Sequence, residues 1–124
     1  MPRRRLTTRL SLWLPPVVYM AVIFYLSSQS DPLPEITARV WDKILHAVEY
    51  AGLAVLLGRA LLGEGLGALT AFAAAALLAA AYGATDEYHQ LFVPLRTGDF
   101  HDWMVDAAGA CLGALASVLR ESLK

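Results

Sequence analysis

Residues 66–90 read LGALTAFAAAALLAAAYGATDEYHQ, an apolar run that ends in the polar sequence DEYHQ. No charged residue occurs between Leu66 and Thr85, and a helix that spans a bilayer needs about 20 mostly apolar residues. The run therefore predicts a transmembrane helix with a polar end that begins at Asp86.

Three further apolar runs lie elsewhere in the chain, at Leu10–Leu26, Trp41–Leu62 and Trp103–Leu119. The 124 residues are 57 % hydrophobic and 17 % charged, whereas a soluble domain is nearer half apolar and a quarter charged. Four spans take about 80 residues, which leaves no room for a separate globular domain. We therefore expect one all-α membrane domain over residues 1–124, a bundle of four transmembrane helices. The expected spans are about residues 10–28, 43–62, 66–86 and 102–119.

Prolines and a basic N-terminal segment mark the first span. Pro15 and Pro16 fall within its first two turns and predict a kink or a late start of the helix. A secretory signal peptide also begins with basic residues and continues as an apolar run, and Ser28-Gln29-Ser30 resembles a cleavage site. The apolar run is long for a signal peptide, so a retained span is the favoured interpretation.

The basic residues are unequally shared between the two ends of the expected bundle. One end carries seven, namely Arg3, Arg4, Arg5, Arg9, Arg59, Arg120 and Lys124. The other end carries three, namely Arg39, Lys43 and Arg96. Because Lys and Arg near span ends accumulate on the cytoplasmic side, we expect both termini in the cytoplasm and both long polar loops outside.

The overall charge and the single cysteine exclude two kinds of feature. Ten basic and eleven acidic residues nearly cancel, so the chain lacks the basic surface of a nucleic-acid-binding protein. One cysteine cannot form an intramolecular disulfide. The apolar, small-residue surroundings of Cys111 predict a buried thiol.

Most of the remaining polar residues fall into three clusters at the ends of the expected spans. The first opens the second span and comprises Asp42, Lys43, His46, Glu49 and Tyr50. The second closes the third span and comprises Asp86, Glu87, His89 and Gln90. The third combines Arg96 with Asp102 and Asp106, around the start of the fourth span.

The three clusters are expected to meet at one end of the bundle. Successive spans alternate in direction, so the start of the second, the end of the third and the start of the fourth lie on the same side of the membrane. Helical periodicity places Asp42, His46 and Glu49 on one face of the second span. Because polar groups in lipid are costly unless they face the bundle interior or a wet cavity, we predict a shared polar pocket at this rim. Gly109 and Gly113 share a face with Asp106 and predict close helix packing there.

Simpler structural roles compete with this pocket for several residues. Lys43 and Glu87 are typical of the interfacial ends of spans, and we favour that role for both. Arg96 fits a loop cation and a counter-charge for the acids equally well. His46, Glu49 and Asp106 lie deeper, where a charge without a function is less tolerable, although they would also suit a purely structural network.

The residue types of the pocket allow acid–base chemistry and metal binding without specifying either. A histidine beside two carboxylates suits general acid–base catalysis, for which His46, Glu49 and Asp86 are the candidates. Imidazole and carboxylate groups are also metal ligands, but the sequence contains neither the His-x-x-x-His pair of zinc proteases nor paired cysteines. We therefore expect no metal and no cofactor, and leave open whether the protein is an enzyme.

With these motifs, the chain resembles the VanZ-like family of small bacterial membrane proteins from about Tyr25 to Gly113. The family's first signature, Asp-Lys-x-x-His-x-x-x-Tyr, is matched by Asp42, Lys43, His46 and Tyr50. The second, Asp-Glu-x-x-Gln before an aromatic residue, proline and arginine, is matched by Asp86, Glu87, Gln90, Phe92, Pro94 and Arg96. The third is matched by Asp102, Asp106, Gly109 and Gly113.

Two positions depart from the family pattern. Leu95 stands where the family often has glycine, so the loop is expected to turn differently. Asp106 stands where asparagine is common, which adds an acid to the pocket.

The resemblance implies a multi-pass protein of the bacterial cytoplasmic membrane with a role in the cell envelope. The namesake of the family is associated with low-level resistance to teicoplanin, a glycopeptide that targets the cell wall. Three functions compete for this chain. In the first, the pocket binds an envelope lipid, a lipid-linked wall precursor or a glycopeptide. In the second, the protein is a membrane-embedded hydrolase or transferase. In the third, it is a small transporter subunit that uses Glu49 and Asp106. The charge-free third span leaves a transporter without a continuous polar path.

Overall fold

The computed structural model describes residues 6–28, 39–93 and 100–124, with side chains described for 8–28, 44–93 and 103–124. It contains four helices, α1 (Leu6–Ser27), α2 (Arg39–Gly63), α3 (Ala68–Gln90) and α4 (Phe100–Ser122). Each includes a segment long and apolar enough to cross a membrane, and no strand occurs in these ranges. The structure therefore confirms the predicted all-α architecture with four candidate spans.

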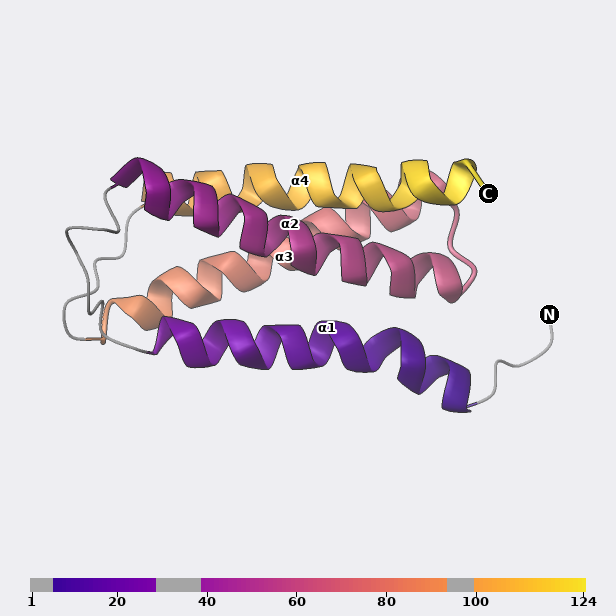
Figure 1. Ribbon diagram of the computed structural model, residues 1–124, viewed down its shortest axis with the longest axis horizontal. Helices are drawn as coiled ribbons and strands as arrows, with labels where there is room; N and C mark the ends of the chain where they lie inside the picture. Colours follow the sequence, from indigo (N-terminus) through magenta and orange to yellow (C-terminus); the bar gives the residue numbers. More distant parts are fainter. Residues whose placement is uncertain (1–5, 29–38, 94–99) are drawn as a thin grey trace.

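The helices run alternately up and down in one bundle (Figure 1). The most extensive interface joins α2 to α4, α3 packs against both, and α1 lies mainly against α2. We call the end where α1 and α3 finish and α2 and α4 begin the polar end. The opposite end, where α1 begins and α4 finishes, is the terminal end (Figure 1).

Two glycines allow α2 and α4 to approach closely. A Cβ atom on Gly109 would collide with the backbone of Ala47, and one on Gly113 would collide with the backbone of Ala51. In a bilayer, where lipid tails are as apolar as leucine, such backbone proximity is a main source of helix association. The contact fixes the rotation of α4 and turns Asp106, one turn earlier, into the bundle.

The buried face of α3 changes character along the helix. Its residues are Ala71, Ala75, Ala79, Gly83, Asp86, Glu87 and Gln90. The spacing of three and four residues keeps all of them on one helical face. The small side chains let α3 pack close to its neighbours, and the same face then carries two carboxylates and an amide into the polar end.

Two tyrosine hydroxyls join helices through backbone carbonyls. The Tyr19 hydroxyl on α1 donates to the Glu49 carbonyl on α2 at 2.6 Å. The Tyr82 hydroxyl on α3 donates to the Met20 carbonyl on α1 at 2.6 Å. In an apolar surrounding these bonds replace partners that water would otherwise supply, and they hold α1 against the other helices.

Two expectations need correction. Pro15 and Pro16 do not delay α1, which begins at Leu6 and runs through both prolines. Cys111 is exposed on α4 rather than buried. In a membrane span the lipid-facing side is as apolar as the interior, so small apolar neighbours do not show which way a side chain points. Ala110 is the fully buried residue at this level of α4.

Candidate functional site

His46 and Asp106 form a buried pair between α2 and α4 at the polar end. His46 Nδ1 lies 3.0 Å from Asp106 Oδ1. His46 is only 7 % exposed and Asp106 is fully buried. A carboxylate accepts hydrogen bonds and an imidazole N–H donates them, so the pair sets the orientation of the imidazole ring inside the bundle.

Glu87 on α3 completes a triad with this pair. One nitrogen of His46, one carboxylate oxygen of Glu87 and one of Asp106 lie within 4.8 Å of one another. Glu87 is 8 % exposed, although we expected it to mark only the interfacial end of a span. Three helices thus each contribute one ionisable side chain to the same buried point.

Tyr50 and Asp86 lie beside the triad, deeper along α2 and α3. Tyr50 is fully buried, one helical turn after His46, and its hydroxyl makes no hydrogen bond of ordinary geometry with the described residues. The carboxylates that influence this hydroxyl electrostatically are those of Asp86, Asp106 and Glu49. Tyr50 therefore presents a buried hydroxyl to the carboxylates of the site.

Gly83 gives these side chains the space they occupy. A Cβ atom at this position would lie 3.3 Å from the Tyr50 ring, 3.3 Å from Asp106 Cβ and 3.4 Å from Asp106 Oδ2. Because contacts below 3.4 Å are tighter than ordinary van der Waals packing, a larger residue would push against both. The backbone of α3 at Gly83 thus forms one wall of the site.

His89 faces a different neighbour. Its Nε2 lies 2.9 Å from the Ser28 hydroxyl, and its ring stacks at a tilt on Phe24 with a centroid distance of 4.6 Å. Both partners are at the end of α1. His89 was predicted to share the pocket with His46, but the structure shows it joining α3 to α1 at the outer part of the polar end.

The structure thus brings together part of the predicted set. His46, Tyr50, Asp86, Glu87, Gln90 and Asp106 are buried at the polar end, whereas Glu49 and His89 are partly exposed. The side chains of Asp42, Lys43, Arg96 and Asp102 lie outside the described residues.

Three contributing residues were not singled out from the sequence. Ser28 is the partner of His89, Tyr82 joins α3 to α1, and the Trp103 indole donates to the Ala80 carbonyl at 2.9 Å. A tyrosine or tryptophan within an Ala- and Leu-rich span indicates a hydrogen bond to another helix, because its polar atom needs a partner when buried. The identity of that partner depends on helix packing.

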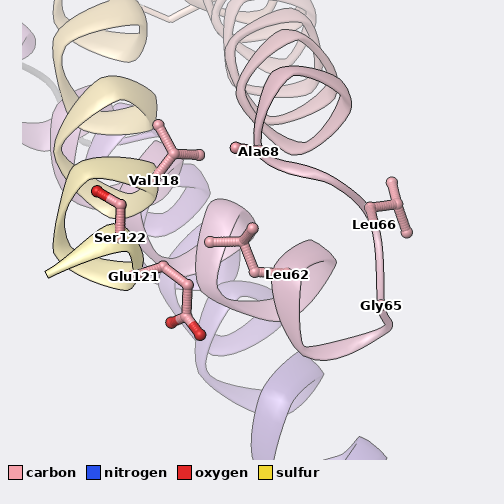
Figure 2. A pocket seen from close by; sticks show the side chains of 7 residues that line it. All are labelled: Leu62, Gly65, Leu66, Ala68, Val118, Glu121 and Ser122. Atoms are coloured by element: carbon pink, nitrogen blue, oxygen red, sulfur yellow. The ribbon is translucent and has the colours of Figure 1, made fainter. Parts of the chain in front are cut away.

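A groove of about 360 Å³ lies at the terminal end of the bundle. Figure 2 shows the residues that line it. The end of α2, the α2–α3 turn and the end of α4 enclose it, and Leu62, Leu66 and Val118 supply apolar walls. Glu121 and Ser122 are the polar residues beside it. None of the predicted site residues lines this groove.

Carboxylates outnumber basic groups among the described side chains of the polar end. Among the described side chains there, the carboxylates are Glu49, Asp86, Glu87 and Asp106, and the basic groups are His46 and His89. Buried carboxylates are stable when they are hydrogen-bonded, paired or bound to a metal. Imidazole and carboxylate are the ligand types found around zinc and manganese, and His46, Glu87 and Asp106 are the residues placed to hold an ion.

Comparison with known proteins identifies the chain by its sequence. The profile of the VanZ/LLP1 family matches residues 5–121, which is nearly the whole chain and includes all three polar clusters. Neither a curated protein nor a solved structure matches the chain significantly. The match to the family profile extends the resemblance seen in the motifs to α1 and the end of α4, and the chain belongs to the VanZ/LLP1 family.

Proposed function

We propose that the polar end of the bundle binds the headgroup of an envelope lipid or a lipid-linked wall precursor. The proposal places this end at the extracytoplasmic face of the bacterial cytoplasmic membrane. The observation that supports it most strongly is the burial of His46, Asp86, Glu87 and Asp106, each at most 8 % exposed, at one end of an otherwise apolar bundle. Ionisable residues inside a membrane are expensive and mark functional sites by default.

The depth of the cluster fits a lipid headgroup. His46 is seven residues into α2 and Asp106 six residues into α4, which places both about 10 Å from the helix starts at 1.5 Å per residue. A headgroup can reach this depth between the helix ends, whereas a soluble substrate would have to leave water. The family's association with teicoplanin makes a glycopeptide with a lipid tail a second ligand to test.

A membrane-embedded hydrolase or transferase is the second candidate function. The 3.0 Å His46–Asp106 pair favours it, because a histidine oriented by a carboxylate is a common general base. A transporter is less well supported. Toward the terminal end the buried face of α3 consists of Ala79, Ala75 and Ala71, which offer no polar groups to a passing ion.

Binding and turnover can be measured on the same samples. The protein is reconstituted in nanodiscs and titrated with a lipid-linked disaccharide-pentapeptide precursor or with teicoplanin. Product release is followed by chromatography. We expect His46→Ala and Asp86→Asn to weaken precursor binding about tenfold or more, the size of a lost hydrogen bond to a charged group. Glu121→Gln, which removes an exposed carboxylate at the terminal end, is the matched control.

The outcomes separate the candidates. A binding protein loses affinity in steps and releases no product, whereas an enzyme loses all turnover in His46→Ala while the helical content is unchanged. Unaltered binding and turnover in both folded variants would contradict a function for the polar end.

A further inference from the structure

We propose that His46, Glu87 and Asp106 bind a divalent transition-metal ion, of the Zn²⁺ or Mn²⁺ class, inside the polar end of the bundle. The three ligand atoms come from three different helices and already lie within 4.8 Å of one another. Nitrogen and oxygen ligands sit about 2.0–2.2 Å from Zn²⁺, which in a tetrahedral site places them about 3.4 Å from each other. Side-chain movements that shorten the longest separation by about 1.4 Å therefore close the triad around one ion.

The ligand set selects the class of metal. Imidazole nitrogen together with carboxylate oxygen suits Zn²⁺, Mn²⁺ and Fe²⁺. Mg²⁺ and Ca²⁺ prefer oxygen ligands only, and Mg²⁺ keeps several of its waters. A site that includes His46 should therefore bind Zn²⁺ or Mn²⁺ more tightly than Mg²⁺.

Burial strengthens the argument for an ion. Glu87 is 8 % exposed, Asp106 is fully buried, and His46 Nδ1 lies 3.0 Å from Asp106 Oδ1. A bound divalent ion would replace the water that buried carboxylates have lost.

The Tyr50 hydroxyl supplies a second, independent observation. It is fully buried, makes no hydrogen bond of ordinary geometry with the described residues, and lies near the carboxylates of Asp86 and Asp106. Three protein ligands leave one position of a tetrahedral ion for water. A water bound there would give the Tyr50 hydroxyl a hydrogen-bond partner of ordinary geometry.

The metal also explains how an acidic site accepts a phosphate. Carboxylates repel an anionic headgroup, whereas a bound divalent ion attracts its phosphate oxygens as it does in phosphoryl-transfer sites. This step rests on the proposed function, while binding of the ion itself does not. The triad would thus serve as a metal-mediated site for a phosphate or pyrophosphate headgroup.

Metal binding is tested first without any precursor. The protein is purified through a histidine-free tag, treated with EDTA, placed in phosphatidylcholine nanodiscs and titrated calorimetrically with ZnCl₂, MnCl₂ and MgCl₂. We expect one Zn²⁺ or Mn²⁺ per chain and weaker Mg²⁺ binding. Loss of a residue that supports a metal ligand typically lowers metal affinity about 10–100-fold. Loss of one of the three ligands should therefore lower it by at least this factor.

The variants are chosen so that a loss of metal binding can be distinguished from a failure to fold. Glu87→Gln and Asp106→Asn keep the size of the side chain, His46→Ala removes the nitrogen ligand, and Glu121→Gln is the carboxylate control. Circular dichroism establishes that each remains helical. Failure of the wild type to bind Zn²⁺ or Mn²⁺, or wild-type affinity in both folded isosteric variants, would overturn the metal site.

A second experiment separates this inference from the proposed function. Precursor binding is measured with Zn²⁺ or Mn²⁺ and again with EDTA, in the same nanodiscs. If the metal binds and the precursor does not bind in either condition, the metal site stands and the proposed function fails. If the precursor binds equally with EDTA, the proposed function stands and the metal-mediated step fails. Binding that requires the metal supports both.

Discussion

His46 on α2 and Asp106 on α4 meet at 3.0 Å between two helices whose backbones approach closely just beyond them, at Gly109 and Gly113. The polar pair and the glycine contact lie on the same face of α4, because positions 106, 109 and 113 are three and four residues apart. The pair is therefore part of the principal interface of the bundle as well as part of the candidate site.

The first prediction concerns this pair. Asp106→Ala removes the carboxylate that lies 3.0 Å from the buried His46 ring, so the free energy of unfolding should fall by about 1–3 kcal/mol, the range for losing one hydrogen bond to a charged group. The measurement is reversible unfolding of the purified protein in mixed micelles. A double-mutant cycle with His46→Ala should give a coupling energy of about 0.5–3 kcal/mol. Additive effects of the two substitutions would show that the pair contributes nothing to stability.

The second prediction concerns the α2–α4 contact. Gly109→Ala and Gly113→Ala each place a methyl group against the backbone of α2, which cannot move aside as a side chain can. Overpacking of this kind costs about 1–3 kcal/mol, measured by the same unfolding experiment. Gly67→Ala is the control, since nothing lies within 4 Å of a Cβ atom there. Equal stability of all three variants would contradict the close approach of the helices.

The convergence of the polar residues was predictable because it follows from topology. Because the four spans alternate in direction, the helix ends that carry His46, Asp86 and Asp106 lie on the same side of the membrane, however the helices pack. The pairing within that end was not predictable in the same way. Helical spacing grouped His46 with Glu49 on one face, yet the partner of His46 is Asp106 on another helix, and Glu49 is only partly buried.

The failures have a common physical cause. In a soluble protein an apolar residue usually points inward, but in a membrane span both lipid and interior accept it. The rotation of each helix is then set by close contacts between small residues and by polar pairs, which depend on all four helices together. The sequence allows both Cys111 and Ala110 to face either lipid or the bundle interior. Only the packing of α4 on α2 shows that Ala110 is buried and Cys111 is exposed.

The third prediction compares two buried tyrosines. Tyr82→Phe removes a 2.6 Å bond to the Met20 carbonyl, and should lower the free energy of unfolding by about 0.6–1.7 kcal/mol, the range for hydrogen bonds between membrane helices. Tyr50→Phe removes a buried hydroxyl that makes no hydrogen bond of ordinary geometry with the described residues, so in metal-free protein it should leave stability unchanged or raise it. Unfolding of both variants after EDTA treatment makes the comparison. A larger loss in Tyr50→Phe than in Tyr82→Phe would show that the Tyr50 hydroxyl is bonded within the protein.

The fourth prediction concerns orientation in the membrane. At the terminal end, Arg9, Arg59, Arg120 and Lys124 are exposed, and Lys and Arg favour the cytoplasmic side of the membrane. The reporters are single cysteines in a Cys111→Ala background. Leu91→Cys lies at the polar end, where Leu91 is 60 % exposed, and Ser122→Cys lies at the exposed end of α4. A membrane-impermeant maleimide should label Leu91→Cys in intact spheroplasts and Ser122→Cys only after permeabilisation. The Cys111→Ala parent controls for labelling of other proteins. The opposite labelling pattern would place the triad on the cytoplasmic side, and a headgroup presented outside the cell could then not reach it.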